Sequence, residues 1–312
     1  MKRVRPLHRK SCLELLEVRS NALPAVMKEG SVASQECPLV TFNHTVRDLI
    51  SKHGKEWCLE HGIVEFPAED FRFSVIMPVF NEANTIEEMI DRVCQVDLPL
   101  QLVVVDDGST DGTSETLRKL NGSGELDKAN GFGSIDVKLL FHKNNQGKGA
   151  ALKTGFLAAS GDVVGIQDAD REYDPQEFII LLSTILADQA DVVYGSRFAT
   201  TNSNQDKQGT SPGWHRWGNG LITSLSNLKT GLNVTDAETC YKVIRKSVLD
   251  QFVDGLIEKR FGIELEMTAK IAKLNGVRFD ERPISYKKRT YAEGKKIGIK
   301  DGFRAMWCIM KY

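Results

Sequence analysis

The chain has 312 residues, of which 41% are hydrophobic and 27% are charged, with a formal net charge of −1. This composition is typical of a soluble globular protein with one large domain or two small ones. The near-zero net charge excludes a global electrostatic attraction to a membrane or to nucleic acid, and we expect no nucleic-acid partner.

Neither a membrane-spanning segment nor a disulfide scaffold is predicted. No run of 18 apolar residues occurs, and Glu14 and Glu17 interrupt the stretch where the apolar part of a signal peptide would follow the basic N-terminus. None of the six cysteines forms a C-x-x-C pair, which excludes a zinc ribbon and suits a reducing compartment. We therefore expect a cytoplasmic location.

The first 70 residues differ from the rest, because they carry no strong strand signal. Apolar residues repeat on roughly one face over Thr45–His61, which predicts one amphipathic helix. We interpret residues 1–70 as an N-terminal extension that is partly helical or disordered, and residues 71–312 as the main domain.

From Phe71 onward, strand-length apolar runs alternate with helical segments. The predicted strands are FSVIMPVF, LQLVVVDD, DVKLLFH, DVVGIQD and DVVYGSRF. Helices are predicted after Asn84, where Glu87 completes a capping box, at Lys148, and at Pro175, a favoured first residue of a helix. Because the strand runs are continuously apolar, they predict an α/β fold with a mostly parallel sheet and helices on both faces.

The last third of the chain begins with a polar loop, 199–213. Helices are predicted over Trp214–Thr230, Lys246–Phe252 and Ile263–Asn275, followed by a strand in VRFDERPISY. The final segment, Ile297–Tyr312, is basic and amphipathic. A helix lying on an anionic membrane has this pattern, and so does a helix packed on the domain with a solvated basic face.

Acidic residues follow several of the predicted strands. Asp168 and Asp170 flank one small residue after a buried strand, and strand positions two apart point the same way. Two such carboxylates repel unless a cation lies between them, and their oxygens suit Mg²⁺ or Mn²⁺. An isolated D-x-D is typical of a solvated turn. With Asp107 and Arg197 at neighbouring strand ends, a metal and phosphate site is favoured, since ligands of such sheets bind beyond these ends.

Simpler interpretations of the individual residues remain open. Asp107 precedes a glycine, and Asp-Gly is a common turn dipeptide. Arg197 could simply pair with a nearby acidic residue, as most arginines do. Lys148 could be a solvated lysine at the start of a helix. GKGAAL, from Gly147, matches neither a Walker A loop nor a complete G-x-G-x-x-G fingerprint.

Taken together, the motifs resemble a known family. SVIMPVFNEANTIEEMI, VVVDDGSTDGT, NNQGKGAALKTGF, GDVVGIQDADREYDP and YGSRF are similar, in order and spacing, to family 2 glycosyltransferases of the GT-A fold. DAETCYKVIRKSVL, FGIELEMTAKIAKLNG and RPISYKKRTYAEGKKIG resemble the branch of dolichyl- or polyprenyl-phosphate mannosyl- and glucosyltransferases. The resemblance covers Phe71 to Tyr312.

The resemblance implies a metal-dependent, inverting transfer of a hexose from a nucleoside-diphosphate sugar to a polyprenyl or dolichyl phosphate. The donor would be of the GDP-mannose or UDP-glucose type. The residues expected at the donor are Pro78, Phe80, Glu82, Val105, Asp107, Lys148, Asp168, Ala169 and Arg197. Those expected at Mg²⁺ or Mn²⁺ are Asp168, Asp170 and Glu172.

Arg289 and Lys295 match basic residues that reach the diphosphate or the acceptor phosphate. A phosphate acceptor needs no general base. For a sugar hydroxyl, Asp236 in DAET is the candidate base, with a turn cap as the alternative, and Glu264 and Glu266 are further candidates.

The chain departs from the family pattern at two residues. Phe80 stands where tyrosine is usual, and Glu172 stands where glutamine is usual. The membrane helices that follow the domain in many relatives are not found after it, which leaves the lipid acceptor open. The alternatives are a glycosyltransferase of the same fold with a soluble glycan or small-molecule acceptor, and a non-catalytic module that binds nucleotide sugars.

Overall fold

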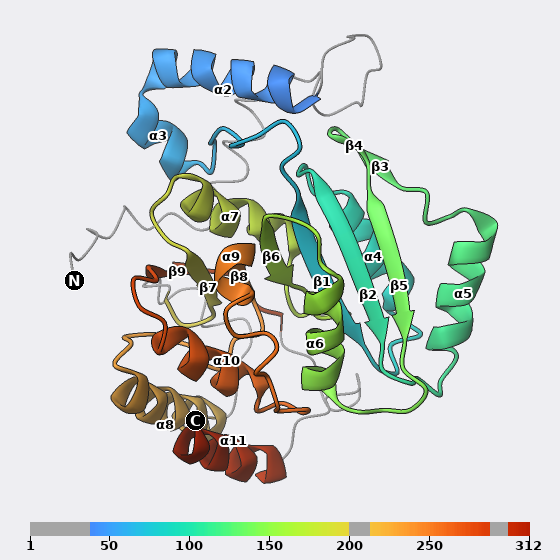
Figure 1. Cartoon of the computed structure of the whole chain (residues 1–312), viewed down its shortest axis with the longest axis vertical. Coiled ribbons are helices and arrows are strands. Elements are labelled where there is room, and N and C mark those ends of the chain that lie inside the picture. Colours follow the sequence, from blue (N-terminus) through green and yellow to red (C-terminus); the bar gives the residue numbers. More distant parts are fainter. Residues whose placement is uncertain (1–37, 200–212, 288–298) are drawn as a thin grey trace.

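The computed structural model describes residues 38–199, 213–287 and 299–312. Its centre is a seven-stranded sheet in the order β5-β2-β1-β6-β8-β7-β9 (Figure 1). The strands are β1 Phe73–Val79, β2 Leu100–Asp106, β5 Asp136–Phe141, β6 Val163–Ile166, β7 Val192–Ser196, β8 Lys242–Arg245 and β9 Phe279–Pro283. A short hairpin, β3 Ala129–Asn130 and β4 Gly133–Ser134, stands apart from this sheet.

One strand of the sheet runs against the others. β8 pairs antiparallel with both β6 and β7, whereas all other pairings are parallel. The carboxyl ends of β1, β2, β5, β6, β7 and β9 therefore share one edge of the sheet, and the residues that precede β8 arrive at the same edge. β8 was not predicted from the sequence, and the sheet is mixed at this position.

Helices cover both faces of the sheet, as the continuously apolar strands predicted. On one face lie α4 Ile86–Cys94, α5 Thr113–Ser123 and α7 Phe178–Leu186, with the short 3₁₀ helix η2 Pro175–Glu177 before α7. On the other lie α6 Lys148–Ala158, α9 Lys246–Leu249 and α10 Ile263–Ala272. Within β1, Val75 and Met77 join the first core and Ile76 joins the second, which is the alternation expected of a strand.

The N-terminal helix is longer than predicted and broken. α2 spans Pro38–His53 and α3 spans Lys55–Glu60. Gly54 separates them with φ of 86°, a conformation that glycine adopts readily. The single helix expected over Thr45–His61 was therefore wrong in both its start and its continuity.

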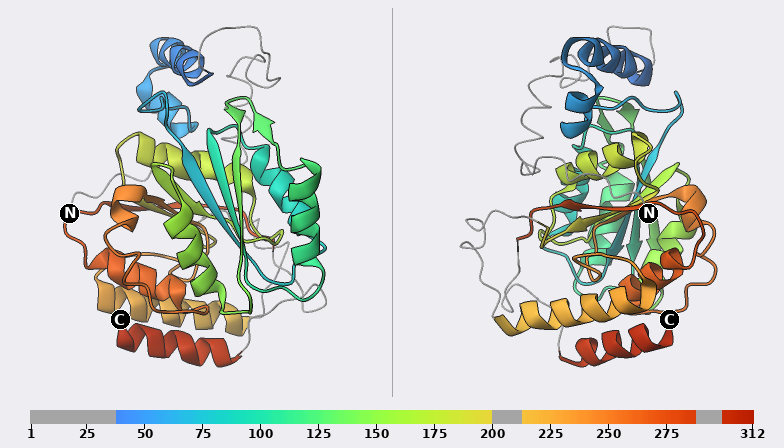
Figure 2. Two further views of the ribbon diagram at one scale, coloured as in Figure 1. Left: turned by 45° about the vertical axis from the view of Figure 1, so that its right-hand side comes forward. Right: turned by 90° about the vertical axis from the view of Figure 1, so that its left-hand side faces the viewer.

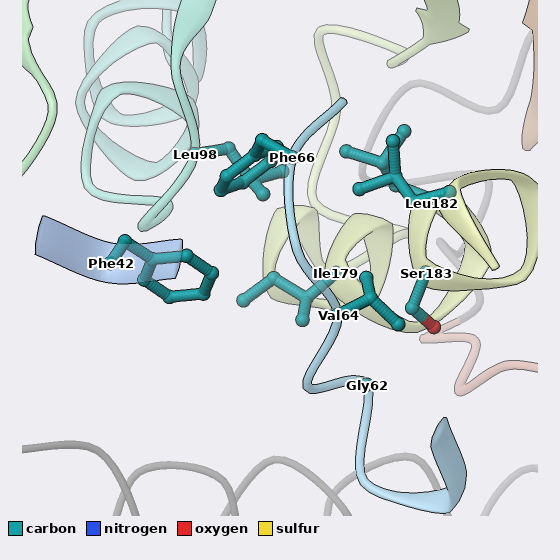
Figure 3. A pocket seen from close by; sticks show the side chains of 9 residues that line it. Phe42, Gly62, Val64, Phe66, Leu98, Ile179, Leu182 and Ser183 are labelled. Carbon is teal, nitrogen blue, oxygen red and sulfur yellow. The ribbon is translucent and has the colours of Figure 1, made fainter. Parts of the chain in front are cut away.

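Residues 38–70 pack into the core of the main domain. Phe42 of α2 is 2% exposed, and its ring lies 5.1 Å from that of Phe66 and 5.4 Å from that of Phe132. Figure 3 shows Phe42 and Phe66 lining a small apolar pocket with Ile179 of α7. This part of the predicted extension is ordered against α7.

The start of α4 also differs from the prediction. Its N-cap residue is Thr85 rather than Asn84, and no side chain caps it. The Thr85 hydroxyl instead donates to the Glu82 carboxylate (3.1 Å) and to the Ala169 carbonyl oxygen (2.9 Å). The predicted capping box is therefore absent at this helix start.

Two further helices, α8 Gly213–Thr230 and α11 Ile299–Lys311, pack together at the end of the molecule opposite α2 and α3 (Figure 2). Among the described residues, no helix combines the length and apolarity needed to span a bilayer.

Substitution of Phe42 by alanine tests whether residues 38–70 belong to the folded unit. Phe42→Ala removes a buried ring, so the free energy of unfolding should fall by about 3–5 kcal/mol in a denaturant titration. Leu228→Ala, at a residue that is 83% exposed, should change it by less than about 0.5 kcal/mol. Equal, small effects of the two substitutions would show that α2 is only loosely attached.

Candidate active site

The acidic loop after β6 lies at the common edge of the strands. Asp170 is buried, at 5% exposure, and its carboxylate accepts a hydrogen bond from the backbone N–H of Glu172 (2.9 Å). The Ala169 carbonyl oxygen accepts from Thr85, which ties the loop to the start of α4. Asp174 closes the loop by accepting a hydrogen bond from the Gln176 N–H, so it is the N-cap of η2.

Lys148 is the counter-ion of Asp168. Its ammonium lies 2.7 Å from the Asp168 carboxylate and 3.3 Å from that of Glu264, and it donates to the Cys240 sulfur. Burial alone would lower the pKa of Lys148, but Asp168 and the other acidic neighbours raise it well above its usual range. A solvated lysine at the helix start is therefore excluded, because the cation lies within the acidic cluster.

The glycines on either side of Lys148 are required by packing. A Cβ at Gly149 would lie 2.1 Å from the Glu258 carbonyl oxygen, and one at Gly147 would lie 2.3 Å from that of Lys259. Both distances are far below van der Waals contact. The GKG sequence thus lets the backbone of a distant loop approach α6 closely.

Arg197 is held in a bidentate ion pair by Asp236. Nε and Nη2 of Arg197 lie 2.6 and 2.7 Å from the two Asp236 oxygens. Asp236 is completely buried, and the arginine side chain keeps 18% exposure. Both oxygens of Asp236 serve to orient the arginine. The role of Asp236 as a general base stays a prediction. A bidentate pair in which both carboxylate oxygens bind an arginine is typical of a residue that positions that arginine.

Glu238, two residues beyond Asp236, was not among the candidates predicted from the sequence. Burial raises its pKa to about 7, although Arg197 acts in the opposite direction. The turn that carries it is fixed by the buried Lys242, whose ammonium donates to the Ala237 carbonyl oxygen (3.2 Å). The sequence DAET already indicated this residue, because it contains a second carboxylic acid, Glu238, two positions after the candidate base Asp236.

Five of the residues expected at the donor, Pro78, Phe80, Glu82, Val105 and Asp107, lie at or near the ends of β1 and β2. Asp107 is 2% exposed and accepts from the backbone N–H of Gly147 (2.7 Å), and its other oxygen lies 2.6 Å from Nδ1 of His142. The Val105 side chain is fully buried in the core. Pro78, Phe80 and Glu82 are partly exposed. The donor contacts of all five residues stay predictions.

Asn81 fixes the loop between Phe80 and Glu82. It has φ of 54°, which is uncommon outside glycine. Its N–H donates to the Ser109 hydroxyl (2.9 Å), and its side-chain oxygen accepts from the Thr110 N–H (2.8 Å). The ends of β1 and β2 are thus joined by a residue that the sequence analysis did not single out.

Glu172 is hydrogen-bonded to a tyrosine from the segment after β9. Its carboxylate accepts a hydrogen bond from the Tyr286 hydroxyl (2.9 Å). Within the described ranges, no three His, Cys, Asp or Glu side chains form a group that could hold a metal ion. Glu172 as a metal ligand stays a prediction. Arg289 and Lys295 lie outside the described residues.

The remaining donor set fits a divalent cation that shares its coordination with a ligand. Asp168 and Asp170 supply carboxylate oxygens, which Mg²⁺ and Mn²⁺ prefer, and such ions commonly complete their shell with phosphate oxygens and water. Arg197 and Lys148 bring positive charge to the same edge. The arrangement suits a cation-bound diphosphate.

Comparison with known families agrees with this site. The profile described as "Glycosyl transferase family 2" matches residues 74–253. The chain belongs to this family. The matched region extends from β1 to the residues after α9 and includes the acidic loop, Arg197 and Asp236.

Similar proteins with assigned activities include polyprenyl-phosphate sugar transferases. The chain is 30% identical over 181 residues to undecaprenyl-phosphate 4-deoxy-4-formamido-L-arabinose transferase of Pseudomonas syringae, covering 57% of this chain and 48% of that protein. It therefore spans about half the length of this relative. It is 28% identical to undecaprenyl-phosphate mannosyltransferase of Micrococcus luteus, over 73% of this chain and 88% of the relative.

A solved structure shares the fold. Glucosyl-3-phosphoglycerate synthase of Mycobacterium tuberculosis with bound UDP has a TM-score of 0.52 and 17% identity over 78% of this chain and 80% of that chain. The complex of the same enzyme with Mn²⁺, UDP and glucosyl-3-phosphoglycerate has a TM-score of 0.50 and 19% identity over the same shares. The predicted GT-A fold is confirmed.

Glu177, just after the acidic loop, should make stability depend on pH. Burial raises its pKa to about 8, so the folded chain keeps a proton that the unfolded chain releases near its ordinary value of 4.5. As the pH rises from about 4.5 towards 8, this group's contribution to stability is lost, by at most about 1.4 kcal/mol per pH unit. Glu177→Gln should therefore lose less unfolding free energy than the wild type between pH 6 and 8.

The control for this measurement is Glu87→Gln, at an exposed glutamate of α4. Chemical denaturation at a series of pH values should give the control the wild-type slope. A Glu177→Gln slope equal to that of the wild type would contradict the buried, protonated state of Glu177.

Proposed function

We propose that this protein is a metal-dependent, inverting glycosyltransferase that moves a hexose from a nucleoside-diphosphate sugar to a polyprenyl phosphate. The observation that carries the proposal is the convergence of the Asp168–Asp170 loop and the Arg197–Asp236 pair at one edge of a family 2 domain. Two relatives are named as undecaprenyl-phosphate sugar transferases, which supports this acceptor class. GDP-mannose and UDP-glucose types remain the candidate donors.

Asp168 and Asp170 would hold Mg²⁺ or Mn²⁺. A cation bound there supplies positive charge that neutralises the departing nucleoside diphosphate. The buried ion pair with Asp236 fixes the Arg197 guanidinium so that its charge faces the same leaving group. Lys148, beside Asp168, adds a second fixed positive charge.

In this reaction an oxygen of the acceptor phosphate attacks the anomeric carbon from the face opposite the diphosphate. The bond from that carbon to the diphosphate oxygen breaks, the electron pair leaves with the diphosphate, and the sugar is inverted. The acceptor is already an anion, so no proton has to be removed. With a sugar hydroxyl as acceptor, Glu238 is better poised than Asp236 to take the proton, because both Asp236 oxygens are held by Arg197.

A transfer assay tests the function directly. The full chain is incubated with a panel of GDP- and UDP-sugars and either polyprenyl phosphate or soluble sugars, with and without Mn²⁺. We expect transfer to polyprenyl phosphate that needs the metal. Transfer only to soluble acceptors would favour the alternative acceptor class, and no turnover with any donor would contradict an enzymatic role.

Asp170→Asn should lower the transfer rate by about a hundredfold or more, because loss of a metal ligand removes several kcal/mol of charge stabilisation. Asp70→Asn, at an exposed aspartate before β1, is the matched control and should keep wild-type activity. Initial rates at saturating Mn²⁺ and donor measure the difference. Equal rates for the two variants would show that Asp170 is not a metal ligand.

We further propose that α8 and α11 place the protein at an anionic membrane surface. Leu228 of α8 is 83% exposed and Met310 of α11 is 71% exposed. The two helices are linked by Lys229, the residue after Leu228, whose ammonium donates to the Met310 carbonyl oxygen (2.6 Å). Trp307 is half-exposed beneath the Lys311 ammonium. Exposed apolar side chains bordered by lysines are typical of interfacial helices.

Vesicle co-sedimentation tests this surface. Leu228→Glu should weaken binding to vesicles containing phosphatidylglycerol by roughly tenfold, because it replaces apolar contact with a repelled charge. Leu157→Glu, at a 59% exposed leucine of α6, should bind as the wild type does. Binding that is unchanged by Leu228→Glu, or that is equal on neutral and anionic vesicles, would contradict the proposed surface.

A further inference from the structure

Tyr286, just beyond β9, lies between two parts of the candidate site, the acidic loop and Arg197. Its hydroxyl donates to the Glu172 carboxylate at 2.9 Å. Its ring centroid lies 5.3 Å from that of Tyr173 and 5.2 Å from the Arg197 guanidinium carbon. One side chain therefore touches both the acidic loop and the arginine of the predicted donor site.

Glu172 is engaged with the segment that contains Tyr286 through its backbone as well. Its carbonyl oxygen accepts from the Lys287 N–H at 2.8 Å. A phenol that donates to a carboxylate makes a charge-assisted hydrogen bond, which is stronger than a neutral one. Burial, followed by the charge of Glu172, raises the pKa of Tyr286 far above its usual value, so the hydroxyl keeps the proton that it donates.

A third bond fixes the same segment. The Ser285 N–H donates to the Glu177 carboxyl at 2.9 Å. Three successive residues, Ser285 to Lys287, are thus hydrogen-bonded to the stretch from Glu172 to Glu177. These residues are more than 100 positions apart in the chain, so the contacts join two separate parts of the site.

The opposite side of Tyr286 is equally well defined. Arg197, which lies over its ring, is itself locked by both oxygens of the buried Asp236. A cation over an aromatic face is attracted to it, so the ring adds a second contact that restricts the guanidinium besides the ion pair with Asp236. A continuous path of contacts runs from Glu172 through Tyr286 to Arg197.

We propose that Tyr286 and Glu172 form a clamp that sets the position of Arg197 relative to Asp170, and that Glu172 acts as a positioning residue rather than as a metal ligand. This inference rests on the proposed function, because it assigns the clamp to the nucleoside-diphosphate site. Substitutions of Tyr286 and Glu172 should therefore have coupled effects on nucleotide affinity, and neither should change the affinity for the metal ion.

The test is a double-mutant cycle with two binding readouts. The chains compared are the wild type, Glu172→Ala, Tyr286→Phe and the double variant, with Glu172→Gln as the conservative variant and Tyr312→Phe as a matched loss of a distant hydroxyl. Mn²⁺ alone is titrated by electron paramagnetic resonance, and UDP and GDP are titrated calorimetrically in the presence of Mn²⁺. Neither readout needs turnover.

We expect Glu172→Ala and Tyr286→Phe each to lower the affinity for whichever nucleotide binds more tightly by roughly fivefold to tenfold. The double variant should show no further loss of affinity, as coupled residues do. Glu172→Gln keeps an oxygen acceptor for the Tyr286 hydroxyl and should restore affinity to within about threefold of the wild type. Mn²⁺ affinity should stay within about twofold in every variant, and Tyr312→Phe should match the wild type in both readouts.

Two outcomes would overturn the clamp. One is a loss of Mn²⁺ affinity of about tenfold in Glu172→Ala but not in Tyr286→Phe, which would make Glu172 a metal ligand. The other is additive loss of nucleotide affinity in the double variant. A wild-type chain that binds neither nucleotide would also contradict the clamp, whereas binding without sugar transfer would contradict only the proposed function.

Discussion

The buried ion pair between Arg197 and Asp236 is the contact on which the rest of the site depends. A carboxylate with no exposure, such as that of Asp236, is stable only with a well-matched partner. The bidentate guanidinium supplies that partner and joins the end of β7 to the turn before β8. The pair exists because β8 runs against its neighbours, which brings DAET to the edge where the parallel strands end.

Charge balance extends this arrangement along the edge. The acidic loop would be strongly repulsive by itself, and Lys148 compensates one of its members through contact with Asp168. Glu264, next to the same lysine, keeps one buried oxygen without a hydrogen-bond partner in the described structure. The edge thus combines fixed cations with carboxylates, which suits a ligand that itself combines a metal ion and phosphates.

The sequence predicted the parts of the fold that depend on local patterns. The five strands with continuous apolar runs were predicted because burial on both faces leaves no polar alternation. β8 was missed because KVIR has only two apolar residues between a lysine and an arginine, unlike the continuously apolar β6. The helix break at Gly54 was missed although glycine readily adopts a positive φ. The start of α4 at Thr85 was missed because its hydroxyl bonds to Ala169, 84 residues away.

The residue types of the site were predictable, but their partners were not. The D-x-D after a buried strand and the arginine after β7 could be recognised as candidates by position. Asp236 was considered as a base because the sequence does not show that Arg197, 39 residues away, takes both its oxygens. The contact of Tyr286 with Glu172 spans 114 residues and leaves no local signal.

The central claim is that the edge bearing Asp170 and Arg197 binds a nucleoside diphosphate through a divalent cation. Pulsed electron paramagnetic resonance of Mn²⁺ bound to the full chain with UDP or GDP tests it most directly, through the coupling of the manganese to phosphorus. We expect a phosphorus coupling that shows direct phosphate coordination in the wild type and that disappears in Asp170→Asn. A coupling that is unchanged in Asp170→Asn, or absent in the wild type with both nucleotides, would contradict the assignment of this edge as the donor site.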